Sequence, residues 1–68
     1  MLYHIRKIDE DTIEHIIDGK SIGKEISITH NYGDLESLRK HLQEWVDQRK
    51  EFFALTKVTN DFGVDLKL

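Results

Sequence analysis

Apolar residues in the second half of the chain repeat with the period of an amphipathic helix. With Leu35 at zero and about 100° per residue, these side chains fall within an arc about 120° wide, the width of a stripe that faces a core. Asp34 is a favoured N-cap residue, and Arg49 and Lys50 suit the negative end of a helix. The pattern predicts a helix over residues 34–53. Its apolar stripe consists of Leu35, Leu38, Leu42, Trp45, Val46, Phe52 and Phe53.

The first half of the chain is typical of β-strands. Every isoleucine of the chain lies before residue 29, and β-branched side chains lose rotamer freedom in a helix. Residues 22–30 predict the clearest strand, because Ile22, Ile26 and Ile28 alternate with polar residues. Residues 2–8 are also strand-like. Both segments are therefore expected to pair in one sheet.

Segment 12–18 fits two structures. As a strand, it places Ile13, His15 and Ile17 on one face, and as a helix it would end at Gly19. The high β-branched content and the Asp-Gly pair at residues 18–19, a strong hairpin turn, favour the strand. We therefore expect three strands before the helix.

Residues after the helix predict a C-terminal hairpin. Phe62, Val64, Leu66 and Leu68 alternate with polar residues or glycine, as in a strand with one wet face. A second short strand is predicted over residues 55–59, with a turn at the Asn-Asp pair that follows.

Together these elements predict one α+β domain over residues 1–68. A small antiparallel β-sheet, made of a three-stranded N-terminal meander plus one or two C-terminal strands, packs against one long amphipathic helix in the order β-β-β-α-β(-β). This order resembles that of the small N-terminal domain of HicB-type antitoxins; the resemblance covers element order only. The predicted core is Ile5, Ile13, Ile17, Ile26, Ile28, Leu35, Leu38, Leu42, Trp45, Val46, Phe53, Val64 and Leu66.

Size and charge narrow the classes of function. A domain of 68 residues buries only about 60% of its unfolded surface, so we expect self-association, as a homodimer. The absence of cysteine excludes disulfides and fits a cytoplasmic protein, and no apolar run approaches the ~20 residues of a membrane span. The net charge of −3, without a polybasic run, disfavours general nucleic-acid binding.

Histidines are the main candidates for site chemistry. His4, His15 and His30 would approach one another if their strands paired suitably, but neither they nor His41 have the spacing of a metal motif. We predict no metal and no other cofactor. No carboxylate has an apolar context that would raise its pKa, so we predict a non-enzyme; a His-dependent ribonuclease is a less favoured alternative.

Arg49 is the unusual residue of the helix because it lies near the middle of the apolar stripe. Its stem could lie on Trp45 with the charge in water, the helix could bend or end there, or it could belong to a contact surface. The favoured function is a non-catalytic protein-interaction module, such as a small inhibitor, adaptor or regulatory protein, including the kind that phages and mobile elements encode. A nucleic-acid-binding or antitoxin-like regulator is the alternative. The predicted partner-binding residues are Trp45, Arg49 and Phe52 as anchors, with Arg39 and Lys40 as a polar rim.

Overall fold

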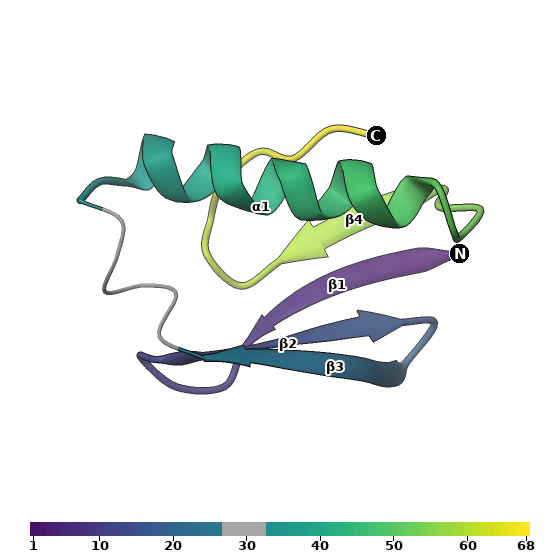
Figure 1. Cartoon of the computed structure of the whole chain (residues 1–68), viewed down its shortest axis with the longest axis horizontal. Helices are drawn as coiled ribbons and strands as arrows, with labels where there is room; N and C mark the ends of the chain where they lie inside the picture. Colours follow the sequence, from purple (N-terminus) through teal and green to yellow (C-terminus); the bar gives the residue numbers. More distant parts are fainter. Residues whose placement is uncertain (27–32) are drawn as a thin grey trace.

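A four-stranded sheet carries one helix on one of its faces (Figure 1). The computed structural model describes residues 1–26 and 33–68. The α+β fold and the order β-β-β-α-β are as predicted, and residues 12–18 contain a strand. The elements are β1 (Leu2–Lys7), β2 (Thr12–Ile17), β3 (Lys20–Ile26), α1 (Leu35–Lys50) and β4 (Lys57–Asn60).

The sheet has the order β3-β2-β1-β4 and is mixed. The first three strands form the predicted antiparallel meander, but β4 runs parallel to β1, with Leu2 opposite Lys57 and Ile5 opposite Asn60. The prediction of a wholly antiparallel sheet is therefore wrong at this pairing. A helix connection can return the chain to the end where an earlier strand began, which allows parallel pairing.

Strand register determines which side chains face the helix. Ile5 on β1 lies opposite His15 on β2, which lies opposite Gly23 on β3, so these positions share the inner face, the face covered by α1. A bulge opposite residues 15–16 leaves Ile22 out of register. His4 is on the other face from His15, so the strands do not pair in the way that would bring these two histidines together; His30 lies outside the described residues.

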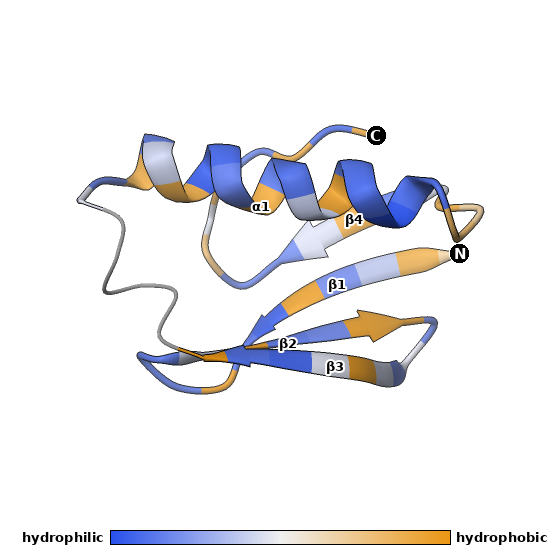
Figure 2. Cartoon of the chain, viewed as in Figure 1, coloured by the Kyte–Doolittle hydropathy of each residue, from blue (hydrophilic) through white to orange (hydrophobic). Residues whose placement is uncertain are grey.

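The core lies between α1 and the inner face, and Figure 2 shows hydrophobic positions of α1 turned toward the sheet. Ile26 and Leu35 were predicted in the core, but they are 75% and 65% exposed. Ile26 pairs with Thr12 and so lies on the outer face, while Leu35 begins the helix one turn before burial starts at Leu38. Ile28 lies outside the described residues. The buried core is Tyr3, Ile5, Ile13, Ile17, Leu38, Leu42, Trp45 and Val46; Phe53, Val64 and Leu66 pack against it half-buried.

The helix begins as predicted and ends earlier. Asp34 is the N-cap, and its side chain accepts a hydrogen bond from the Ser37 backbone N–H at 2.8 Å. The helix ends at Lys50, because the next turn tightens: the Phe52 N–H bonds the carbonyl of Arg49, three residues back. Arg49 is therefore still helical, which excludes the interpretation that the helix ends before it.

The residues after β4 form no second strand, so the predicted C-terminal hairpin is wrong. The side chain of Asn60 shapes the turn: its oxygen accepts from the Phe62 N–H and its nitrogen donates to the Val64 carbonyl. The extended segment is then held by the Gln43 side chain, which bonds both the N–H and the carbonyl of Lys67. Alternating apolar residues thus pack beside the helix without a strand partner.

Candidate functional site

An open groove lies between the C-terminal end of α1 and the β2–β3 hairpin. It consists of two adjoining hollows of about 290 and 270 Å³, which share Ile22 and Phe53 as lining residues. We call these two hollows together the groove. The first is also lined by Gln48, Arg49 and Phe52, and the second by Met1, Ile17, Asp18 and Lys20.

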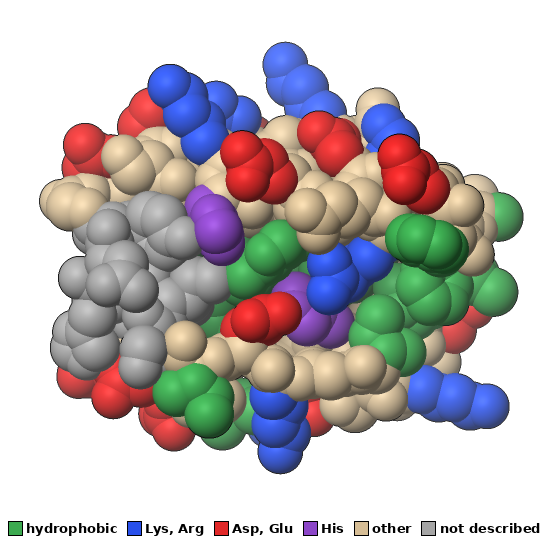
Figure 3. All heavy atoms as spheres, in the orientation of Figure 1, with side chains coloured by type: hydrophobic (Ala, Val, Ile, Leu, Met, Phe, Trp, Pro, Cys, Tyr) green, Lys and Arg blue, Asp and Glu red, His purple; other side chains and the backbone are tan. Residues whose placement is uncertain are grey.

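A cluster of polar side chains lies on the inner face beside this groove. The Tyr3 hydroxyl and Nδ1 of His15 share a hydrogen bond of 2.6 Å, and the guanidinium carbon of Arg49 lies 5.6 Å from the centroid of the Tyr3 ring. Oε1 of Glu25 is 3.8 Å from Nε2 of His15. We call these four residues the polar cluster. Figure 3 shows basic, histidine and acidic side chains side by side between the helix and the lower strands, with hydrophobic side chains around them.

Two nitrogens of the polar cluster are buried without a hydrogen-bond partner. They are Nε2 of His15, a residue that is only 2% exposed, and Nε of Arg49, which is half-buried. The Arg49 guanidinium donates one hydrogen bond of 3.3 Å, to the carbonyl of Trp45. No carboxylate in residues 1–26 or 33–68 forms an ion pair with Arg49. A buried polar group without a partner costs free energy, and the described residues provide no hydrogen-bond partner for these two nitrogens.

Burial also controls protonation in the polar cluster. Removal from water lowers the pKa of His15 to about 4, and the positive charge of Arg49 acts in the same direction. Burial raises the pKa of the Tyr3 hydroxyl far above its ordinary value. Both groups are therefore neutral at neutral pH, and the charges of the cluster are those of Arg49 and Glu25.

The predicted anchor residues do not form a single surface. Trp45 is 7% exposed and belongs to the core, where its ring meets His15 edge-on at 4.8 Å between centroids. Phe52 is 79% exposed and lines the groove together with Arg49. The guanidinium of Arg49 lies over the Tyr3 ring, and its contact with Trp45 is a hydrogen bond to the backbone.

The predicted rim residues lie away from the groove. Arg39 is ten residues before Arg49, which corresponds to about 15 Å along the helix. Its guanidinium forms an ion pair of 2.6 Å with Glu36, and Lys40 follows it on an exposed position. The structure therefore unites Arg49 with Phe52 and separates both from Arg39 and Lys40.

Sequence reasoning missed the partners that the sheet supplies to this site. Tyr3, Glu25 and Ile22 come from strands far from the helix in sequence, and only the pairing register brings them to Arg49. The shared face of His15 with Ile13 and Ile17 was visible in the alternation of β2. That alternation was the one available signal for a buried histidine.

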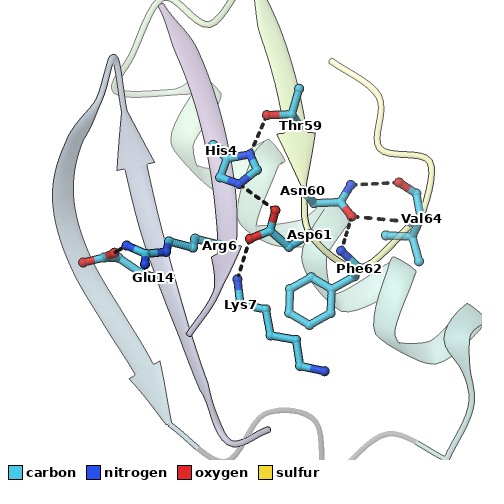
Figure 4. Close-up of polar contacts among 9 residues, drawn as sticks. All are labelled: His4, Arg6, Lys7, Glu14, Thr59, Asn60, Asp61, Phe62 and Val64. Atoms are coloured by element: carbon cyan, nitrogen blue, oxygen red, sulfur yellow. Dashed lines mark hydrogen bonds and ion pairs between the residues drawn. The ribbon is translucent and has the colours of Figure 1, made fainter. Parts of the chain in front are cut away.

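A second polar network lies on the outer face of the sheet (Figure 4). Nδ1 of His4 lies 2.6 Å from the Thr59 hydroxyl, and Nε2 lies 3.0 Å from the carboxylate of Asp61. The other oxygen of Asp61 accepts from the Lys7 backbone N–H at 3.1 Å. A hydroxyl, an imidazole and a carboxylate in series resemble a nucleophile with its base. Neither hollow of the groove borders this network, and its bonds connect β1 with β4, so its evident effect is to hold the parallel pair.

No protein-family model, curated protein or solved structure matches the chain. Among the described residues, no group of three or more histidine, cysteine or acidic side chains is placed to hold a metal ion. No helix in the described part of the chain has the length and apolar character needed to cross a membrane.

Proposed function

We propose that this chain is a non-catalytic protein-interaction module, of the kind that acts as a small inhibitor, adaptor or regulatory protein, and that its partner binds in the groove. The observation that carries this proposal is the position of Phe52. This large apolar side chain is 79% exposed at the edge of an open hollow, next to the half-buried charge of Arg49. Aromatic residues and arginine are the types enriched at binding hot spots.

The groove offers apolar surface on both of its walls. Ile22 of β3 is 43% exposed, and Phe53 is half-buried against the core while lining both hollows. Burying an exposed phenylalanine contributes about 1.5–3 kcal/mol. A partner side chain inserted between Ile22 and Phe52 would gain part of this contribution.

The test is selection from a displayed library of short random peptides on the immobilised wild-type chain. We expect peptides to be enriched, and we expect Phe52→Ser to lose them. Leu35→Ser is the matched control, because Leu35 is also a large exposed apolar residue, 65% exposed at the start of α1, but does not line the groove. No enrichment on the wild type, or equal binding by the two variants, would contradict the proposal.

Self-association is the second part of the proposed function. Within residues 1–26 and 33–68, no strand pairs with the outer edge of β3, all of whose residues are exposed. Such an edge is a template for pairing with another chain. We expect light scattering to give a dimer for the wild type and a monomer for Ile26→Lys, which places a charge on the most exposed isoleucine of that strand. A monomeric wild type at high protein concentration would refute this part alone.

A further inference from the structure

We propose that the groove binds a partner segment in which a carboxylate stands next to an apolar side chain, and that Arg49 is the residue that binds this carboxylate. The inference rests on the proposed function and adds the chemistry of the partner. Three observations carry it: Arg49 has no carboxylate partner among the described residues, Nε2 of His15 in the same cluster has no hydrogen-bond partner, and Arg49 lines an apolar hollow.

Arg49 carries a charge that the described part of the chain does not balance. Its guanidinium lies over the Tyr3 ring and donates to one backbone carbonyl, while its Nε is buried without an acceptor. The other helix arginine, Arg39, has a carboxylate of Glu36 at 2.6 Å. A half-buried guanidinium favours a carboxylate partner, because the bidentate geometry matches and the contact is partly shielded from water.

His15 provides the second, independent observation. His15 is only 2% exposed, and its Nδ1 is already bonded to the Tyr3 hydroxyl. If that hydroxyl donates, Nε2 carries the proton of the neutral ring and faces the Glu25 carboxylate at 3.8 Å, too far for a hydrogen bond. In that tautomer, the polar cluster holds an unused N–H donor of His15 in addition to the guanidinium of Arg49.

Glu25 is the competitor for this position within the chain. It is the acidic residue nearest to the donors of the polar cluster, yet its side chain is 49% exposed and makes no hydrogen bond there. Its negative charge disfavours a second carboxylate until the side chain turns toward water. Removal of this charge should therefore strengthen the binding of an acidic segment, whereas a stabilising internal ion pair would predict the opposite.

The apolar residues that line the groove determine which kind of partner side chain fits beside the carboxylate. Ile22, Phe52 and Phe53 line the hollow next to Arg49, so an apolar partner side chain fits there. The second hollow adds Lys20, while the carboxylate of Asp18 in the same hollow accepts the Leu2 backbone N–H at 2.7 Å. The lining thus has two cationic side chains, Arg49 and Lys20, against the one carboxylate of Asp18, a balance that favours an acidic segment although the whole chain carries a net charge of −3.

The experiment uses two displayed libraries of short random peptides that differ only at one fixed central position, Glu in one and Gln in the other. On the wild-type chain we expect the Glu library to be recovered about tenfold better, the gain of one charge-assisted hydrogen bond. Arg49→Gln should abolish this preference, and Arg49→Lys should keep part of it. Arg39→Gln, the matched control, should leave it unchanged. Glu25→Gln should increase it.

Each result has a distinct meaning. If the wild type recovered both libraries equally and binding still required Phe52, the proposed contact between Arg49 and a carboxylate would be refuted. The proposal of a protein-interaction module would stand. No recovery from either library would refute both proposals. A preference that survives Arg49→Gln in a variant whose circular dichroism matches the wild type would assign the carboxylate to another residue. In ¹⁵N spectra, binding of a recovered Glu peptide should shift the Arg49 Nε–H resonance, and an unchanged resonance would contradict the proposed contact.

Discussion

Buried His15 should make this protein lose stability in mild acid. The pKa of His15 is lowered from 6.5 to about 4 in the folded state because its ring is removed from water. Between these values the unfolded chain binds a proton that the folded chain does not bind. By linkage, the free energy of unfolding then rises with pH in this window, so the contribution of His15 is fully present above pH 6.5 and is lost as the pH falls toward 4.

The size of the effect follows from the pKa difference. Each pKa unit corresponds to about 1.4 kcal/mol, which gives about 3 kcal/mol over the whole window and about 2 kcal/mol between pH 7 and pH 5. A protein of this size has a total stability of only about 5–10 kcal/mol, so the loss is large enough to measure. Exposed carboxylates that form hydrogen bonds, such as Asp34, lose their contributions at lower pH.

Urea unfolding followed by tryptophan fluorescence, at a series of pH values from 7 to 5, measures this directly. His15→Gln keeps a group that can accept from the Tyr3 hydroxyl but does not titrate, so its stability should change little over this range. His41→Gln removes a half-buried histidine that also packs on Trp45, at 4.9 Å, and should retain the wild-type slope. If His15→Gln lost stability as steeply as the wild type, the buried neutral imidazole could not be the source of the pH dependence.

Three further predictions concern stability alone. Tyr3→Phe leaves Nδ1 of His15 without its partner and should cost about 1–3 kcal/mol in urea unfolding at pH 7; a cost below experimental error would contradict the bond. Asp34→Ala removes the N-cap of α1 and should cost about 1 kcal/mol, whereas Asp34→Asn should cost less. Gln43→Ala should speed amide hydrogen exchange of residues 64–68, since the side chain bonds both backbone groups of Lys67. Glu44→Ala, which changes an exposed neighbour, is the control. If it speeded the exchange of residues 64–68 as much as Gln43→Ala does, the hydrogen bonds of Gln43 could not be responsible.

Local patterns carry the secondary structure of this chain because each depends on neighbouring residues. The helix follows from a stripe of period 3.6 and an N-cap, and β2 follows from β-branched residues before an Asp-Gly turn. Alternation over residues 62–68 predicted a strand; Phe62, Val64 and Leu66 do pack against the core, but no strand forms, because the alternation could not specify a partner. Side chains on an extended segment alternate whether the segment joins a sheet or packs beside a helix.

Sequence alone determined that Arg49 lies among apolar residues and that Phe52 is close to it. Only the tertiary structure decided what surrounds them, because strand register and the parallel return of β4 depend on contacts between distant residues. Register places His15 and Tyr3 beneath the arginine and sends Ile26 to the opposite face, and a slip of one residue would exchange the two faces. Strand register thus decides which residues surround Arg49 in the polar cluster, whereas the helix pattern by itself places Arg49 there.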